Sequence, residues 1–386
     1  MPEQPGGRLL TAGLDRGRAG AAWRPRRFPS AALVATFLVA LPLSAVTATA
    51  QERIERLFYY VDRESSWESL VEHIDEISIV APSAYSVDAS GVVWGAVDPR
   101  LLDLAAEQGV GVVPLIVNPG FDQEDLHALL GDDAARRRTI ESLVGECSRH
   151  GYRGIQFDFE NLAHEDRDAY TGFYREAAQA LHGAGCEISV AVVHRLEEYA
   201  GPTRYHGWML ADWRGGYDLA GLAEAGDFIS VMTYSQHTRR TPPGPQAGLP
   251  WVREVAEYFL QFVPPAKLSL GIPTGSQHWY TSYEEKIEPE LARSYSEGVS
   301  YAWGLGLAER HGATPVWSDE HQVAYAFYPV GGTFEWIFFE DARSFRAKLG
   351  LVDELGLRGF SAWVLGPEDP ALWDVLAERR GAAARR

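Results

Sequence analysis

The chain has 386 residues, of which 46% are hydrophobic and 23% charged, and its formal net charge is −18. This composition is that of a globular protein and excludes a disordered or fibrous one. The acidic balance argues against a nucleic-acid binder, and against any anionic polymer as partner unless the contacts are local. Two cysteines exclude a disulfide-rich scaffold and a multi-cysteine zinc site.

Residues 1–50 have the three parts of a secretory signal peptide. A cluster of arginines precedes an apolar run from Ala31 to Ala45, and the segment closes with Ala48-Thr49-Ala50. We therefore expect cleavage after Ala50 and a mature protein that is secreted, periplasmic or attached to the cell envelope, with no stable membrane insertion. An uncleaved anchor is the alternative, although an apolar run of about 15 residues is short for a membrane span of roughly 20.

Short apolar runs and amphipathic helical patterns alternate along the rest of the chain. The apolar runs cover 57–61, 77–81, 110–117, 154–160, 188–193, 228–234, 268–272 and 359–363. Runs of this length are typical of parallel strands that are buried on both faces. Because no GxGxxG fingerprint is present, the alternation favours an α/β fold of the (β/α)8 TIM-barrel type over a doubly wound sheet.

One stretch, 276–340, interrupts the alternation. It is rich in aromatic residues and carries two alternating runs, 323–328 and 333–339, with the turn signal Gly331-Gly332 between them. We expect a small α+β insertion between strand 7 and helix 7, so that 51–386 form one barrel domain. Its aromatic residues either wall a cleft or fill the insertion's own core; they include His278, Trp279, Tyr280 and Trp303.

The strand predicted at 154–160 carries the strongest signal for chemistry. Side chains alternate along a strand, so one side receives Ile155, Phe157 and Phe159, and the other receives Gln156, Asp158 and Glu160. If the apolar set faces the helices, the polar set points into the barrel. Glu160 then stands at the carboxyl end of the strand, where barrel enzymes place their catalytic groups.

Two buried carboxyl groups this close together should perturb one another. Desolvation and the repulsion between Asp158 and Glu160 raise the pKa of one of them. A raised pKa is what a general acid needs at neutral pH. The alternative is a polar barrel interior that is held by hydrogen bonds and has no chemical role.

The segment from Arg153 to Glu160 resembles the DGxDxDxE signature of glycoside hydrolase family 18, the chitinase-like barrels. Gly154, Asp158 and Glu160 match, whereas Arg153 and Gln156 stand where the family usually has Asp. Three further kinds of segment agree with the resemblance. Segment 231–234 is similar to the family's MxY motif but is followed by Ser235 in place of Asp, and segment 359–363 is similar to the end of the family's strand eight with its tryptophan. Segments 242–251 and 340–344 are similar to a bacterial branch of the family that includes spore-cortex-lytic and cell-wall-associated members.

The resemblance implies a retaining hydrolase of N-acetylglucosamine-containing glycans, chitin-like or peptidoglycan, in which the substrate's own acetamido group is the nucleophile. By similarity, Glu160 is the acid and base, Asp158 orients the acetamide, and Tyr234 donates a hydrogen bond to the acetamide oxygen. Trp363 would form a platform under the sugar. The residues expected at the substrate also include Gln156, Met232, Asn161 and Ser235. No metal and no cofactor are implied, and we expect a monomer.

The departures from the family pattern have consequences. With Gln156, the inner relay to Asp158 becomes a neutral hydrogen bond, and Asp158 should ionise more easily. Ser235 removes an acidic neighbour and casts doubt on chitin as the substrate. One alternative is a non-catalytic chitinase-like carbohydrate-binding protein, against which the intact Glu160 argues. Another is a cell-envelope scaffold that neither binds nor cleaves glycans.

Four further residues have open interpretations. Asn118, like Asn161, directly follows a predicted strand and is either a cap or turn residue or a ligand contact. His194 either titrates near neutral pH or is a hydrogen-bonded residue at the rim. We expect Cys147 and Cys186 to be buried small apolar residues, with a disulfide as the alternative in an oxidising compartment.

Overall fold

The computed structural model describes residues 54–238, 241–281 and 294–384. The predicted signal peptide lies outside the described residues. Among the helices in these ranges, none combines the length and hydropathy that a membrane crossing requires.

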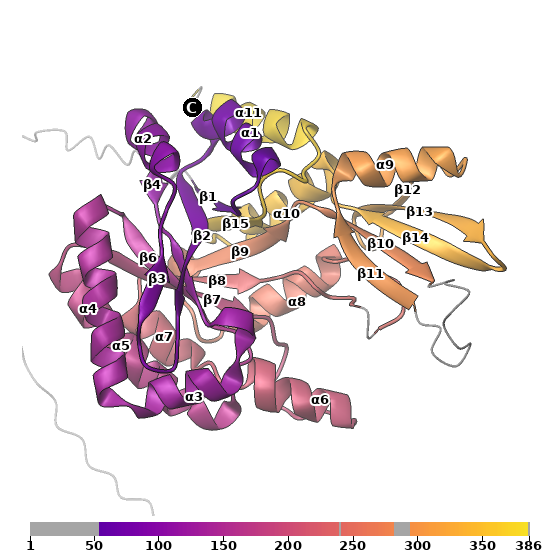
Figure 1. The fold of residues 1–386 in the computed structure, drawn as a ribbon. Coiled ribbons are helices and arrows are strands. Elements are labelled where there is room, and N and C mark those ends of the chain that lie inside the picture. Colours follow the sequence, from indigo (N-terminus) through magenta and orange to yellow (C-terminus); the bar gives the residue numbers. More distant parts are fainter. Residues whose placement is uncertain (1–53, 239–240, 282–293, 385–386) are drawn as a thin grey trace, which may run out of the picture. The chain divides into compact units, whose positions relative to one another are not determined.

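Parallel strands close into a barrel in the described part of the chain (Figure 1). They are β1 (Glu55–Tyr60), β2 (Ile79–Val87), β4 (Gly111–Val112) with β5 (Leu115–Val117), β6 (Gly154–Asp158), β7 (Glu187–Val193), β8 (Phe228–Met232), β9 (Leu268–Pro273) and β15 (Gly359–Trp363). Each strand pairs with the next around the ring, and pairing of β1 with both β2 and β15 closes it. The predicted (β/α)8 barrel is confirmed.

Helices cover the outside of the barrel. They are α1 (Glu64–His73), α2 (Pro99–Gln108), α3 (Gln123–Gly131), α4 (Asp133–His150), α5 (Arg167–Gly183), α6 (Arg204–Trp208), α7 (Leu219–Ala225), α8 (Leu249–Phe259), α10 (Ala342–Glu354) and α11 (Ala371–Ala384). Several begin at an aspartate that accepts a backbone N–H of the first turn. Asp98, Asp132 and Asp341 do so for α2, α4 and α10, which satisfies donors that have no partner within the helix.

Two strands differ from the sequence-based expectation. The run predicted at 110–117 is divided into β4 and β5, and Pro114 lies in the gap, where its lack of an N–H removes a ladder hydrogen bond. β2 extends six residues beyond the predicted end at 81, and its extension pairs antiparallel with β3 (Val93–Gly95). The short polar turn between β2 and β3 hides this hairpin in the apolar pattern.

The insertion stands between β9 and α10. Its strands form an antiparallel sheet in the order β11-β10-β14-β13-β12, and α9 accompanies them. The bounds are β10 (Ser276–Thr281), β11 (Ser294–Val299), α9 (Tyr301–Arg310), β12 (Val316–Ser318), β13 (Val323–Val330) and β14 (Thr333–Phe339). Buried Leu307 and Ala308 of α9 join Ala326 and Ile337 of the sheet in a hydrophobic cluster separate from that of the barrel.

An ion-pair network lies at the amino ends of the barrel strands. Arg153, just before β6, binds Glu55 at 2.7 Å and Glu187 at 3.1 Å. Arg358, just before β15, also binds Glu55 at 2.7 Å. The departure from the family pattern at Arg153 therefore falls at the end of β6 opposite to Glu160, where it joins the start of β6 to the starts of β7 and β1.

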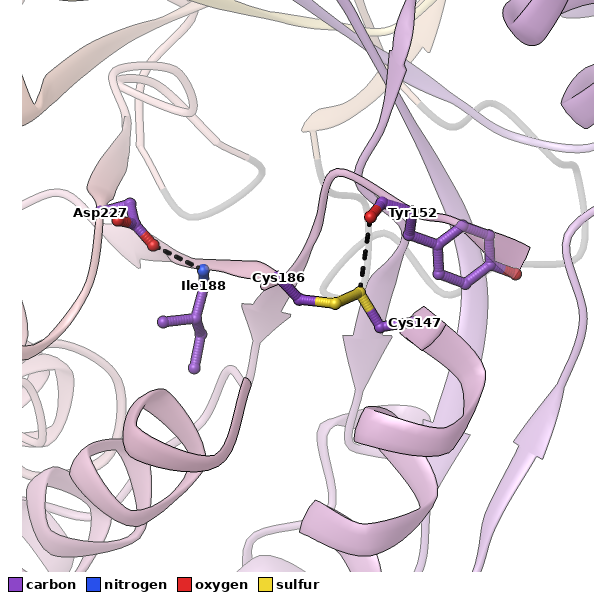
Figure 2. The surroundings of a disulfide bond; sticks show 5 residues. All are labelled: Cys147, Tyr152, Cys186, Ile188 and Asp227. Carbon is purple, nitrogen blue, oxygen red and sulfur yellow. Dashed lines mark hydrogen bonds between the residues drawn. A yellow bond between two sulfur atoms is a disulfide. The ribbon is translucent and has the colours of Figure 1, made fainter. Parts of the chain in front are cut away.

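A disulfide joins Cys147 of α4 to Cys186 immediately before β7, with a Cα–Cα distance of 6.6 Å (Figure 2). The expectation of two unpaired buried cysteines is therefore wrong. The two residues are 39 positions apart, and they meet because the intervening β6 and α5 form one β–α unit that brings the chain back to the same end of the barrel. The bond is buried near Tyr152, whose carbonyl oxygen lies 3.5 Å from the Cys147 sulfur.

Loss of this bond should destabilise the fold. Replacing both Cys147 and Cys186 by Ala is expected to lower the free energy of unfolding by about 2–4 kcal/mol, because the unfolded chain regains the freedom of the closed loop. Urea denaturation of the wild type and the double variant, each with and without reductant, measures this. Reductant should lower the free energy of unfolding of the wild type to nearly that of the variant, and it should leave the free energy of unfolding of the variant unchanged. Equal stability of the wild type with and without reductant would contradict the prediction.

Candidate active site

The side chains of β6 alternate as the sequence predicts. The ring of Phe157 lies 5.7 Å from that of Phe173 and 5.5 Å from that of Tyr174, both on α5. Phe159, just after the strand, lies 6.0 Å from Tyr170 of the same helix. The apolar set therefore packs against the helical layer, and the polar set points to the barrel interior.

A hydrogen-bonded polar layer fills the interior beneath the site. The Gln156 side chain accepts a hydrogen bond from the Tyr59 hydroxyl at 2.7 Å and donates to Ser189 and Ser230 at 3.1 and 3.2 Å. Ser361 continues the layer through contacts with Ser230 and, at 2.6 Å, with Ser269 of β9. Residues of β1, β6, β7, β8, β9 and β15 thus share one network.

This layer corrects the expectation that Gln156 is hydrogen-bonded to Asp158. Its side chain is fully buried and is absent from the lining of the cavity described below. Its amide is already engaged with Tyr59, Ser189 and Ser230, and no hydrogen bond joins it to Asp158. It holds the strands below the site in register.

The backbone that carries Glu160 is fixed from two sides. The Tyr217 hydroxyl donates to the Phe159 carbonyl oxygen at 2.7 Å. The Asn118 side chain donates to the Glu160 carbonyl oxygen at 2.9 Å and accepts from the Glu160 N–H at 3.1 Å. Asn118 stands at the start of the 3-10 helix Pro119–Phe121 without capping it through its side chain, and its amide also donates to the Asp122 carbonyl oxygen at 3.3 Å. It serves the turn after β5 and ties the end of β5 to the end of β6.

Asn161 serves the turn that follows. Its φ is +56°, in the left-handed region that asparagine tolerates. Its amide nitrogen donates to the Phe121 carbonyl oxygen at 3.0 Å, and its side chain does not line the cavity. The structure thus places Asn161 in the turn after β6, outside the lining of the cavity.

The two carboxyl groups are strongly perturbed. Asp158 is 8% exposed, and its Oδ1 is buried without a hydrogen-bond partner. Burial raises the pKa of Asp158 to about 7. Burial, and then the nearby charge of Asp158, raise the pKa of Glu160 to about 8. Near neutral pH the pair therefore retains a proton, as a general acid requires.

Both carboxyl groups open into a cavity of about 670 Å³ at the carboxyl ends of the strands. Its lining includes most of the predicted site, namely Asp158, Glu160, Met232, Tyr234, Ser235 and Trp363. Trp363 ends β15, is 36% exposed, and lies 5.3 Å from the Tyr59 ring. Thr274 holds this strand end, because its N–H donates to the Trp363 carbonyl oxygen at 2.9 Å.

The segment between β7 and α7 forms a wall of the cavity that the sequence analysis missed. Its aromatic lining residues are Tyr199, Tyr205, Trp208 and Trp213. Trp208 and Trp213 lie 6.2 Å apart across the short π-helix Met209–Arg214. The high density of aromatic residues in this connection is the sequence signal that could have predicted this wall.

The aromatic residues of the insertion were expected either to wall a cleft or to fill the insertion's own core, and none of the insertion's described residues lines the cavity. Trp279 is 1% exposed and belongs to the packed interior. His278 bonds Glu335 at 3.1 Å, and its ring lies 5.2 Å from that of Tyr280 and 5.4 Å from that of Trp303. These four aromatic residues contribute to the insertion's own packing.

His194 is a hydrogen-bonded residue of the cavity wall. Burial lowers its pKa to about 3, so the ring is neutral. The neutral tautomer is set by two partners: Nδ1–H donates to the Met232 carbonyl oxygen at 3.2 Å, and Nε2 accepts from Arg214 at 2.9 Å. His194 is therefore not a group that titrates near neutral pH.

Because the pKa of Asp158 is raised in the folded protein, the free energy of unfolding should depend on pH. Between about pH 4 and 7 the unfolded chain loses a proton that the folded protein keeps, so the native state is destabilised as the pH rises. Asp158→Asn removes this penalty and should raise the free energy of unfolding at pH 8 by about 1–3 kcal/mol. The gain should shrink as the pH falls towards 4.

Urea denaturation across this pH range measures the effect, with Asp103→Asn on the exposed face of α2 as a matched control that should show no such trend. A loss of stability in Asp158→Asn, or a gain that does not depend on pH, would contradict the prediction.

Comparison with known proteins agrees with this geometry. The chain is 31% identical over 269 residues to the cortical fragment-lytic enzyme of Bacillus subtilis (strain 168), a match that covers 69% of this chain and 59% of that protein. The chain thus spans less than two thirds of that relative's length. The C-terminal domain of a putative chitinase from Desulfitobacterium hafniense superposes with a TM-score of 0.73 at 27% identity, covering 84% of this chain and 99% of that one.

A chitinase from Chromobacterium violaceum also superposes with a TM-score of 0.73, at 25% identity, and covers 84% of this chain and 98% of that one. The family model for glycosyl hydrolases family 18 matches residues 100–368. This match extends from α2 through the loop that follows β15 and includes both carboxyl groups of the site. The chain belongs to glycosyl hydrolases family 18.

Proposed function

We propose that the protein is an exported, retaining glycoside hydrolase that cleaves N-acetylglucosamine-containing glycans with Glu160 as acid and base. The observation that carries the proposal is a pair of carboxyl groups, Asp158 at the end of β6 and Glu160 two residues beyond it, both with raised pKa, at the mouth of a large cavity. Membership of glycosyl hydrolases family 18 supports the same reaction class.

In the first step, protonated Glu160 donates its proton to the glycosidic oxygen as the bond from that oxygen to the anomeric carbon breaks. The acetamide oxygen of the same sugar attacks the anomeric carbon and gives a cyclic oxazolinium ion. In the second step, the Glu160 carboxylate removes a proton from water, which attacks the anomeric carbon and reopens the ring. Glu160 is protonated again, and the configuration is retained.

Asp158 is suited to the acetamide group. Its buried Oδ1 has no hydrogen-bond partner in the protein, so it is free to accept the acetamide N–H. That bond pulls the acetamide oxygen towards the anomeric carbon, and a negative charge on Asp158 stabilises the positive ring that forms. Tyr234 lines the same cavity and would donate a hydrogen bond to the acetamide oxygen.

Aromatic side chains are suited to the sugar rings. Trp363 presents a partly exposed face at the end of β15, next to Tyr59. A flat indole offers a large apolar surface with little loss of side-chain entropy, which fits the apolar face of a pyranose. Trp208 and Trp213 on the opposite connection extend this kind of surface along the cavity.

Export rests on two features. Residues 1–50 have the pattern of a signal peptide. The buried disulfide between Cys147 and Cys186 is of a kind that persists in oxidising compartments and is rare in the cytosol. Both features support a secreted or cell-envelope location.

Replacing Glu160 by Gln should lower kcat on chitin oligomers or peptidoglycan fragments by about 100-fold or more, because the proton donor is lost. Mass spectrometry of the new reducing ends measures turnover, and proton NMR of the first product of the wild type should show the anomeric configuration of the substrate linkage. Glu165→Gln, an exposed carboxyl outside the cavity, is the matched control.

Undiminished turnover by Glu160→Gln would refute the role of Glu160, and an inverted first product would refute the substrate-assisted step. Saturable oligosaccharide binding by the wild type, with no product from any of these substrates, would instead identify a carbohydrate-binding protein without catalysis.

A further inference from the structure

One cation of the cavity wall has no acidic partner. Arg214 ends the π-helix Met209–Arg214 and lines the cavity that holds Asp158 and Glu160. Its Nε is buried and has no hydrogen-bond partner, and none of the ion pairs among the described residues includes it. Burial lowers the pKa of Arg214, as expected for a guanidinium that no carboxylate compensates.

Neutral His194 fixes the position of this cation without reducing its charge. Its Nε2 accepts a hydrogen bond from Arg214 at 2.9 Å, and its Nδ1–H is held by the Met232 carbonyl oxygen. The His194 ring also meets the Trp251 ring edge to face at 4.7 Å. A histidine in this tautomer orients a guanidinium, whereas a carboxylate in its place would neutralise it.

The chain around Arg214 packs against the loop that follows Glu160. A Cβ atom added to Gly216 would lie 2.4 Å from Leu162, and one added to Gly215 would lie 2.7 Å from His164. The two glycines therefore allow the end of the π-helix to approach residues 162–164 closely. Arg214 therefore ends a helix that packs against the residues shortly after Glu160.

A second arginine supports this arrangement. Arg195 donates a hydrogen bond to the Arg214 carbonyl oxygen at 2.9 Å. Its own charge is compensated by Glu198 at 2.8 Å, a carboxylate that Arg167 also binds. Glu197 also lines the cavity, but it is exposed to solvent, so its field on Arg214 is screened. The positive charge of Arg214 remains available to a ligand.

A partly buried guanidinium without a counter-ion carries a desolvation cost, and it gains most from a carboxylate that it binds with two parallel hydrogen bonds. A neutral glycan offers no such group. A protein with a net charge of −18 also repels an anionic polymer at long range, so an acidic glycan needs a local cation at the site.

We propose that Arg214 binds a carboxylate carried by the glycan, so that the preferred substrate is an acidic N-acetylglucosamine-containing polymer and not neutral chitin. This inference rests on the proposed function and adds the charge of the substrate to it. Within this substrate class, the carboxylate is either that of a lactyl ether on an alternate sugar or that of an attached peptide.

The test compares oligomers of one length that differ only in this group. They are oligomers of N-acetylglucosamine and muramic acid with a free lactyl carboxylate, the same with the carboxylate converted to its methyl amide, the same with a peptide on the lactyl group, and chitin oligomers. The wild type should prefer a carboxylate-bearing oligomer to the methyl amide. Arg214→Gln should reduce this preference in kcat/KM by about 10- to 100-fold, which is the usual effect of a lost charge-assisted hydrogen bond.

Two further variants make the comparison specific. Arg204→Gln removes the same charge from an exposed position of α6 outside the cavity and should leave the preference unchanged. Arg214→Lys keeps the charge and should retain part of the preference, and it serves if Arg214→Gln does not fold. If kcat/KM for the free-carboxylate oligomer depends on Arg214, the lactyl group supplies the carboxylate. If kcat/KM depends on Arg214 for the peptide-bearing oligomer alone, the peptide supplies it.

Equal losses on the acid and the methyl amide, or a wild type without preference, would overturn the proposal. Absence of turnover of every oligomer by the wild type would contradict the proposed function instead. Isothermal titration of the acid and amide oligomers against the wild type and Arg214→Gln then still tests the carboxylate contact.

Discussion

The desolvation of two neighbouring carboxyl groups at the end of one strand is the constraint on which the site depends. Asp158 ends β6 and Glu160 follows two residues later, and both side chains line the cavity at the barrel mouth, where burial removes them from water. Ionising both is unfavourable, and the pKa of Glu160 rises to about 8 as a result. A carboxyl group that keeps its proton at neutral pH can act as a general acid, and the fold must hold it there against the cost to stability.

The surrounding residues provide that support. Asn118 and Tyr217 fix the backbone at the end of β6, and the Gln156 layer holds the strands beneath it. This layer also explains how the chain departs from the family pattern without losing the arrangement. A carboxylate at position 156 would add a charge to a buried region, whereas Gln156 offers both an acceptor for Tyr59 and donors for Ser189 and Ser230. Asp158 is thereby left without an inner partner and with an oxygen available to substrate.

Local patterns predicted the barrel and the direction of Asp158 and Glu160, because alternation along one strand is a property of the sequence itself. The partners of Gln156 were not predictable in this way, since they come from strands whose register is set by closure of the whole barrel. The same is true of Asn118 and Asn161, which look equivalent after their strands but face different neighbours. The sequence left two interpretations of the insertion's aromatic residues open, and only tertiary packing decides between them: those rings pack within the insertion, and the connection after β7 supplies the aromatic wall of the cavity. The disulfide depends on the return path of the chain, which spacing alone does not reveal.

The titration of the Glu160 side chain tests the central claim most directly. In protein with carbon-13-labelled carboxyl groups, NMR spectra recorded across pH should show one glutamate resonance with a pKa near 8 that is missing from Glu160→Gln. In Asp158→Asn the same resonance should titrate at lower pH, because a neighbouring negative charge has been removed. A Glu160 resonance that titrates at the ordinary value of about 4.3, or that does not respond to Asp158→Asn, would contradict the account.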